Sequence, residues 1–386
     1  MKIGLFLFIL CAPLSVSGSE MMWQLKSSIS GAHYENFSLT PTKITETMLS
    51  KSMSGMLEYS TPSTSVSVKP SLSANLYTDK TRNKTDLGLL FSVRHNTETF
   101  IFNLTTDTQR DSSFSSELTT TGYIDKKKDR KSDNYSPSAT YIIDQLSTIS
   151  LSHSFTDVDY IEGISDGLYD YEYSNSSLSY TRLTKSLGSI SISYADISQK
   201  IDMLRSQYDT SILQFGLSND YSETINYSVT MGLRHYKNYI GYANYRASDN
   251  GWVMNLNAAK QFDRASITTG ISREVTPSGG GYTILQNKAN LTYRYRLSPL
   301  ATTTIFGTAL KNTRETFSTD LSRYYGNFGI GINYNFAKNW LLSIDLQHRR
   351  NRSEEGLKGN DNALKIRLSY SGSKTPIKYY GNTTEF

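Results

Sequence analysis

The sequence predicts an all-β protein, a transmembrane antiparallel up-and-down β-barrel of about 18 strands, with 16 strands as the alternative. Three observations predict it. Apolar and polar residues alternate along many segments, short turns alternate with long polar loops, and the chain after the N-terminal segment has no run of 18 or more apolar residues. A chain that crosses a membrane without helices must do so as a closed barrel.

The alternation is clearest between Gly326 and Asn351. Every second residue from Phe328 to Phe336 is apolar, glycine or asparagine lies between them, and the pattern resumes at Trp340. Period two is the strand signature. One face is too apolar for water and the other too polar for a core, so we expect lipid on one side and a water-filled lumen on the other. The alternative is a soluble β-sandwich, in which the apolar face would be a shared core.

The connections also alternate in length. Short turns are expected near residues 62, 97, 146, 185, 221, 262, 297 and 338, and longer polar segments separate them. Eight short turns join sixteen strands, and one more strand at each end, about 23–34 and 362–370, gives 18 with both termini in the periplasm. If the segment before residue 51 is instead a periplasmic plug, the number falls to 16. Strands are also expected at about 51–60 and 64–77.

The N-terminal residues 1–18 are predicted to be a signal peptide, because Lys2 precedes the apolar stretch "IGLFLFIL" and small residues follow. Residues 19–371 would form the outer-membrane barrel of a Gram-negative bacterium, and 372–386 a polar C-terminal tail. The single cysteine, Cys11, lies inside the signal peptide; "FIL" before it argues against a lipoprotein. The net charge of +5 is small and diffuse, which does not indicate a nucleic-acid partner.

The polar face is predicted to line the lumen, with more basic than acidic residues on it. A basic lumen concentrates anions, so these residues could guide an anionic polymer or solute. The alternative, given equal weight, is that these residues merely keep the lumen wall hydrated and pair with neighbouring acidic residues. Tyr236 and Tyr325 are also expected inside. The predicted lumen-lining residues are Arg94, Arg234, Lys288, Arg294, Arg296, Arg323, Asp345, Arg349, Lys365 and Arg367.

The sequence does not indicate an enzyme. Its five histidines form no pair with metal-ligand spacing, and no nucleophile–base arrangement is visible. The acidic loop after Thr156 does not match a calcium-binding loop. The segment "TPSGGG" from Thr276 lacks the features of a phosphate loop and is expected to be a flexible turn. No catalytic residue, metal site or cofactor is predicted.

Two regions resemble a known family. They are "GAHYENFSLTPTK" followed by "TSVSVKPSLSANLYTD", and the ending "LSRYYGNFGIGINYNFAKNWLLSIDLQHRRNRSEE" with "NDNALKIRLSYSG". These segments resemble the β-barrel porin type 2 family, which includes outer-membrane barrels of exopolysaccharide export systems of the Vibrio biofilm polysaccharide and exosortase-associated types. The resemblance implies polysaccharide transport from periplasm to cell exterior, beside a periplasmic polysaccharide export partner.

Three functions are therefore considered. The first is exopolysaccharide export through the basic lumen, with outer-membrane lipid, polysaccharide and the barrel-insertion machinery as partners. The second is a passive porin for small anionic solutes, for which the loop of residues 109–133 is the candidate constriction. The third is a surface adhesin or structural barrel that acts through its charged loops.

Overall fold

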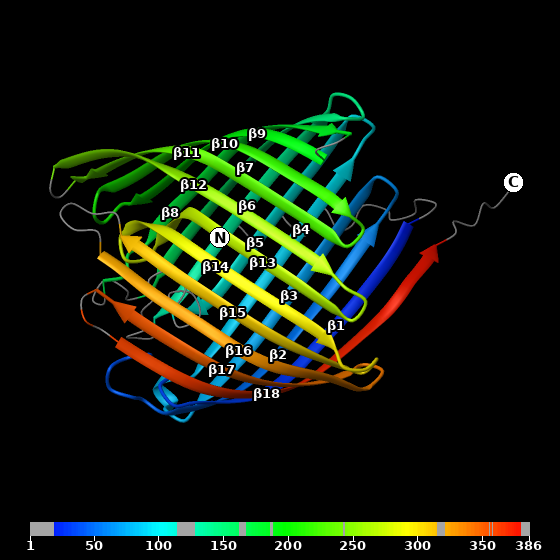
Figure 1. The fold of residues 1–386 in the computed structure, drawn as a ribbon, viewed down its shortest axis with the longest axis vertical. Coiled ribbons are helices and arrows are strands. Elements are labelled where there is room, and N and C mark those ends of the chain that lie inside the picture. The colour runs from blue at the N-terminus through cyan, green and yellow to red at the C-terminus, as the bar shows by residue number, and fades with distance from the viewer. Residues whose placement is uncertain are drawn as a thin grey trace, which may run out of the picture.

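Eighteen antiparallel strands form one closed sheet in the computed structural model (Figure 1). The structure describes residues 19–113, 128–161, 167–185, 188–241, 244–314, 321–354, 356 and 358–379. The predicted signal peptide and the chain after residue 379 lie outside the described residues. Each strand pairs with the strands before and after it in the chain, and β1 also pairs with β18, which closes the barrel.

The strands are long enough to cross a membrane when tilted. Their bounds are β1 (Ser19–Tyr34), β2 (Glu46–Ser60), β3 (Thr64–Tyr77), β4 (Lys84–Asn96), β5 (Phe100–Ser112), β6 (Asp129–Ile142), β7 (Ser147–Tyr160), β8 (Tyr171–Thr184), β9 (Gly188–Ile201), β10 (Ser206–Ser222), β11 (Ile225–Ile240), β12 (Tyr245–Gln261), β13 (Ala265–Ser278), β14 (Tyr282–Arg296), β15 (Ala301–Arg314), β16 (Leu321–Ala337), β17 (Trp340–Ser353) and β18 (Lys358–Tyr379). One 3₁₀-helix, η3 (Lys80–Arg82), lies between β3 and β4.

The predicted strand number of 18 is confirmed, and the 16-strand alternative is wrong. The segment before residue 51 is not a periplasmic plug that precedes the barrel, because its residues form β1 and the start of β2, which pair along their whole length. The eight predicted turns fall at or beside the breaks after β2, β4, β6, β8, β10, β12, β14 and β16. We call this side of the barrel the turn end and the opposite side the loop end. Ser19 pairs with Tyr379, so both ends of the sheet lie at the turn end.

The closing strand is longer than the sequence indicated. It was expected to end near Tyr370, but β18 continues to Tyr379. The reason is its partner: β1 begins at Ser19, and its first residues pair with the end of β18. Backbone groups in a membrane need such partners, so pairing extends as far as both strands allow.

The two faces of the wall differ as the alternation predicts. Large apolar side chains on one face are exposed, such as Leu233 at 72% and Phe328 at 58%. The other face is the interior, because residues of distant strands meet on it: Gln199 Nε2 of β9 donates a hydrogen bond to the backbone oxygen of Ser278 of β13, at 3.2 Å. Such a contact can form only across the inside of a barrel.

Aromatic side chains gather on the outer face at the turn end. Trp340 lies 5.1 Å from Tyr370 and 6.3 Å from Phe336, measured between ring centroids. Such an aromatic belt is typical of the level where lipid headgroups meet hydrocarbon. In the described part of the chain, no helix has the length and apolar character needed to cross a membrane.

Candidate functional site: the barrel interior

The register places the predicted lumen-lining residues on the inner face. Most come from the last strands of the chain, and the others are single residues on β4 and β11. The residues are Arg94 on β4, Arg234 on β11, Lys288, Arg294 and Arg296 on β14, Arg323 on β16, Asp345 and Arg349 on β17, and Lys365 and Arg367 on β18.

Several of these cations have only uncharged cross-strand neighbours. Arg294 pairs with Ser266 and Thr304, and Arg367 pairs with Ser343 and Ser30. Lys288, Arg294 and Arg296 are exposed. Strands β14 to β18 therefore present positive charge to the interior, without an acidic residue directly opposite Arg294 or Arg367. Lys365 differs, because Asp345 is its cross-strand neighbour.

Arg349 is not available to a solute. It is 8% exposed, and its Nε and Nη2 donate hydrogen bonds to Asp361 Oδ2 at 2.8 and 2.6 Å. Nη2 also lies 3.4 Å from the backbone oxygen of Phe37, and the guanidinium lies 4.8 Å from the ring centroid of Tyr34. Arg349 and Asp361 thus form a buried ion pair that holds a neighbouring loop. Asp361 could have been found from the sequence, because it shares the parity of Lys365.

The held segment, which we call loop 35–45, connects β1 to β2 and folds into the barrel. The backbone N–H of Asn36 donates to Asp361 Oδ1 at 2.7 Å, and Asn36, Phe37 and Leu39 are buried. A side chain at Gly359 would collide with the backbone oxygen of Leu39, so this close approach requires glycine. The sequence placed this segment between the strands expected at 23–34 and 51–60 and gave no sign that it turns inward between them.

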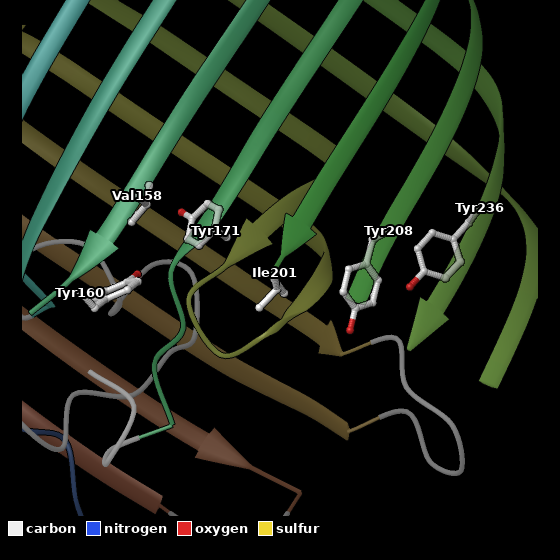
Figure 2. Close-up of a cluster of buried hydrophobic side chains, with 6 residues drawn as sticks. All are labelled: Val158, Tyr160, Tyr171, Ile201, Tyr208 and Tyr236. Atoms are coloured by element: carbon white, nitrogen blue, oxygen red, sulfur yellow. The ribbon is translucent and has the colours of Figure 1, made fainter. Parts of the chain in front are cut away.

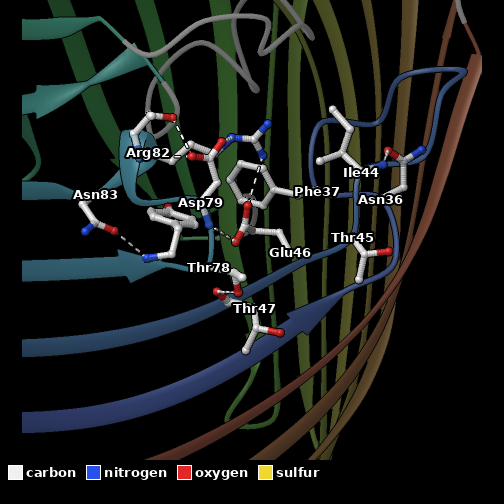
Figure 3. Close-up of polar contacts among 12 residues, drawn as sticks. Asn36, Phe37, Ile44, Thr45, Glu46, Thr47, Thr78, Asp79, Arg82 and Asn83 are labelled. Atoms are coloured by element: carbon white, nitrogen blue, oxygen red, sulfur yellow. Dashed lines mark hydrogen bonds and ion pairs between the residues drawn. The ribbon is translucent and has the colours of Figure 1, made fainter.

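A second ion pair fixes the other side of loop 35–45 (Figure 3). Arg82 Nη1 of η3 lies 3.4 Å from Glu46 Oε2 of β2, and the Glu46 side chain is 2% exposed. The Arg82 guanidinium also lies 5.5 Å from the ring centroid of Phe37. Hydrogen bonds from the Thr81 hydroxyl and backbone N–H lower the pKa of Asp79, so the cap of η3 stays charged.

The tip of the β13–β14 hairpin also leaves the wall. Strand β12 pairs with β13 only from Met254–Arg273 to Gln261–Ser266, whereas β13 and β14 remain paired up to Ser278–Tyr282. We call residues 277–283 the hairpin tip. Thr283 and Ile284 are buried, 3% and 2% exposed, although they lie near the loop end. The hairpin tip therefore bends inward from its place beside β12.

The hairpin tip reaches strands β7 to β11 on another side of the barrel, where it packs against tyrosine side chains (Figure 2). The backbone N–H of Tyr169 donates to the backbone oxygen of Gly279 at 2.8 Å, and the Tyr208 hydroxyl donates to that of Gly281 at 2.9 Å. A Cβ atom at Gly279 would lie 2.7 Å from Cζ of Tyr160, too close for any side chain. The glycines predicted to form a flexible turn are thus needed for close packing. The buried residues that line this contact are Val158, Tyr160, Tyr171, Ile201, Tyr208 and Tyr236.

Two further predictions concern the interior. Tyr236 lies inside but is only 4% exposed and stacks on Tyr208 at 6.5 Å, so it belongs to the packing around the hairpin tip. Arg234 is 4% exposed, which leaves little of it for a solute. Tyr325 also lies on the inner face. The candidate constriction at 109–133 falls partly outside the described residues, since 114–127 are not described.

An 18-stranded closed antiparallel barrel with short turns at one end is the fold of outer-membrane porins. No protein-family model matches the sequence. No curated protein matches it either. Among solved structures, Pseudomonas aeruginosa OccK2 (OpdF) is similar with a TM-score of 0.54 and 10% identity, covering 92% of this chain and 98% of that one.

Two similar structures contain small molecules. OccK2 in complex with glucuronate has a TM-score of 0.51 and 9% identity and covers 91% of this chain and 98% of its own. P. aeruginosa OpdK with vanillate has a TM-score of 0.50 and 8% identity, and the alignment covers 92% of this chain and 99% of that chain. At such identities the likeness establishes the fold.

The comparisons correct two predictions. The resemblance to the β-barrel porin type 2 family and the predicted role in exopolysaccharide export and biofilm formation are wrong, because the similar structures are porins of the Occ/Opd group. The quoted segments gave a wrong family because their pattern is not specific. Tyrosine-rich alternating strands that end in arginine are compatible with almost any barrel that has lipid outside and water inside. They predict the fold and do not distinguish families.

Proposed function

We propose that this protein is an outer-membrane porin that passes small anionic solutes, with carboxylates as the preferred class. It would sit with the loop end facing the cell exterior and both termini in the periplasm. Long loops outside and short turns inside are the usual arrangement of such barrels. The protein itself would perform no chemistry on the solute.

One observation carries the proposal: the exposed cations Lys288, Arg294 and Arg296 line one side of the interior, with Arg367 four strands further round. Low-dielectric walls lined by one sign of charge focus the field and raise the local concentration of counter-ions. A carboxylate passing this wall can accept charge-assisted hydrogen bonds from successive guanidinium groups. Loop 35–45 and the hairpin tip occupy part of the interior, which favours solutes of modest size.

The similar structures support the same class of solute. Glucuronate and vanillate, present in OccK2 and OpdK, are both small molecules with one carboxylate. The solute of this protein would need to match the spacing of its own cations, since few residues are shared at about a tenth identity. The proposal therefore names a chemical class and no individual molecule.

Ion selectivity in planar bilayers tests the proposal. Under a KCl gradient, we expect the zero-current potential of the wild-type channel to indicate anion preference. In the variant R294E/R296E/R367E, the inner wall loses three positive charges and gains three negative ones, so the preference should shift toward cations. Liposome swelling should show faster entry of glucuronate than of glucose through the wild-type protein only.

The matched control reverses three cations on the outer face, Lys200→Glu, Lys237→Glu and Arg246→Glu. These residues pair with Gln207, Asp209 and Tyr239 on the outer parity of their strands. The control carries the same change in net charge and should keep the wild-type selectivity. A wild-type protein that conducts no current, or a triple inner variant with unchanged selectivity, would contradict the proposal.

A further inference from the structure

A group of cations lies on the outer face of the barrel, away from the lumen. Lys311, Tyr324, Arg352 and Lys358 are successive cross-strand neighbours in one row across β15 to β18. Arg350 lies two residues from Arg352 on the same face of β17. All these residues are close to the loop end of their strands. We call Lys311, Arg350, Arg352 and Lys358 the outer basic patch.

Among the described residues, the cations of the outer basic patch have no acidic cross-strand neighbour. Arg350 pairs with Gly326 and Asn360, and Lys311 pairs with Asn287 and Tyr324. Arg352 and Lys358 face each other directly, and like charges in that position repel. The Lys311 ammonium lies 5.4 Å from the ring centroid of Tyr324, whose side chain is 41% exposed. An anion bound between these cations would relieve their repulsion.

An apolar groove of about 420 Å³ lies next to the patch on the same face. Its rim includes His348, which lies two residues before Arg350 on β17, and its acidic rim residue Glu35 accepts a hydrogen bond from Asn362 at 2.9 Å. The groove runs away from the loop end, toward the part of the wall that faces hydrocarbon. Its apolar lining consists of Phe328, Ile330, Leu346 and Leu364.

Apolar lining alone would mean little, because every lipid-facing wall is apolar. The combination is informative: a hollow with a largely apolar lining lies one row of side chains from a cluster of four cations, since His348 of the groove and Arg350 of the patch are neighbours on the same face of β17. Guanidinium groups bind phosphate oxygens through paired hydrogen bonds, and clustered lysine and arginine at a membrane surface indicate recognition of anionic lipid. A water-soluble anion without an apolar part would gain no contacts from the apolar groove.

The rest of the outer rim helps to identify the occupant. On β6 to β8, about half-way round the barrel, the corresponding positions carry the acidic residues Asp133, Asp157, Asp159 and Glu172. In Figure 1, the orange and red strands β16–β18 lie well away from the green strands β7 and β9. If the basic side of one copy contacted the acidic side of the next, the two contacts would point in opposite directions, and such an arrangement cannot close into a small ring. A lipid is therefore a better occupant of the patch than a second copy of this chain.

We propose that the outer basic patch and the groove bind one phosphate-bearing lipid of the outer leaflet, with its phosphate among the four cations and one acyl chain along Phe328 and Leu346. The inference goes beyond solute passage, and it shares with the proposed function only the orientation of the loop end toward the exterior. Its residues lie outside the lumen, so they are separable from ion selectivity.

Native mass spectrometry of the purified full-length protein in a zwitterionic detergent tests the proposal. The probe is phosphatidic acid, and phosphatidylcholine with the same chains is the comparison lipid. We expect one phosphatidic acid to bind in preference to phosphatidylcholine, and its affinity to fall at least tenfold in R350E/R352E. Lys200→Glu, a reversal of an outer-face cation remote from the patch, should leave the affinity unchanged.

A second variant adds bulk without changing charge. A Cβ atom at Gly326, beside Arg350, would meet no heavy atom within 4 Å, so Gly326→Leu should fold and weaken lipid binding by filling space under the patch. Equal binding of the two lipids, or equal phosphatidic acid affinity in wild type, R350E/R352E and G326L, would overturn the proposal. Ion selectivity of the same variants in bilayers should match that of wild type. A wild-type protein without anion preference would count against the porin function alone and would leave the lipid proposal standing.

Discussion

Loop 35–45 and the hairpin tip both fold into the barrel, but different forces hold them. Loop 35–45 depends on two ion pairs, Arg349–Asp361 and Arg82–Glu46, each with a nearly buried carboxylate. The hairpin tip depends on tyrosine packing and on backbone carbonyl groups that accept hydrogen bonds. The two segments therefore obstruct the same lumen through different chemistry.

The difference predicts different responses to damage. A buried ion pair is intolerant of losing one member, because the remaining charge keeps its desolvation cost without its partner. The tyrosine contact is spread over several side chains, and each contributes a smaller share. Loop 35–45 should therefore release after a single substitution, whereas the hairpin tip should loosen by degrees unless its close backbone approach is blocked.

The largest effect is expected from Asp361→Ala. The Asp361 side chain is fully buried and that of Arg349 is 9% exposed, so the substitution leaves an almost buried guanidinium without its carboxylate. Such a loss costs about 3–5 kcal/mol. We expect loop 35–45 to open, and trypsin to cleave after the exposed Lys43 far faster than in wild type, with the fragment identified by mass spectrometry.

The control for this prediction replaces both partners. Arg349→Met with Asp361→Leu removes the two charges together, and apolar replacements of similar volume restore much of the stability lost in a single variant. Cleavage after Lys43 should then fall back toward the wild-type rate. If D361A and the double variant are cleaved equally fast, the ion pair is not what holds the loop.

A smaller but clear effect is expected from Gly279→Val. Its Cβ atom would lie 2.7 Å from Cζ of Tyr160, whose side chain is buried, so either the ring or the hairpin tip must shift. Overpacking of this kind costs about 1–3 kcal/mol. The hairpin tip should be displaced from β7–β10, and single-channel conductance should rise because the tip no longer occupies the interior.

Two further variants sharpen the result. Gly31→Val places the same side chain on a strand where a Cβ atom meets nothing within 4 Å, and it should leave conductance unchanged. Tyr160→Ala combined with Gly279→Val removes the obstructing ring and should return conductance toward that of Tyr160→Ala alone. A rise in conductance that persists unchanged in the double variant would argue against this specific contact.

The strand plan was accessible from the sequence because it rests on local patterns. The expected strand at 64–77 coincides with β3, since "TPS" ends the preceding strand and period two begins at once. The same period assigns Arg294 and Arg367 to one face, because a closed sheet with one lipid-facing side permits a single register. The ends of some strands were less accessible. Strands β1 and β2 begin before the expected residues 23 and 51, and β18 extends beyond the expected 362–370 because its length depends on a partner at the opposite end of the chain.

The inward segments were not accessible, because their contacts join residues far apart in the chain. Asn36 is hydrogen-bonded to Asp361, and Gln199 to Ser278. No local sequence pattern links the two residues of either pair. Arg349 illustrates the consequence: its parity indicated the inner face, but only the folded chain shows that Asp361 and loop 35–45 already occupy it. Parity predicts which side a residue faces and says nothing about what it meets there.

The smallest effect is expected from Tyr208→Phe, which removes one hydrogen bond from the hairpin tip and keeps the ring. The Tyr208 hydroxyl donates to the backbone oxygen of Gly281 at 2.9 Å, and the side chain is 3% exposed. A buried hydrogen bond contributes about 0.5–1.5 kcal/mol net. The stacking of Tyr208 on Tyr236 does not need the hydroxyl, so the tip should stay in place for most of the time.

This variant decides whether the hairpin tip is held by distributed contacts. We expect the mean single-channel conductance to stay near that of wild type, with brief openings to the higher level expected for Gly279→Val. Tyr221→Phe, at a side chain 73% exposed on the same strand, should show none. A full and lasting shift to the higher level would mean that one hydrogen bond holds the tip, so the tip, like loop 35–45, would be released by a single substitution.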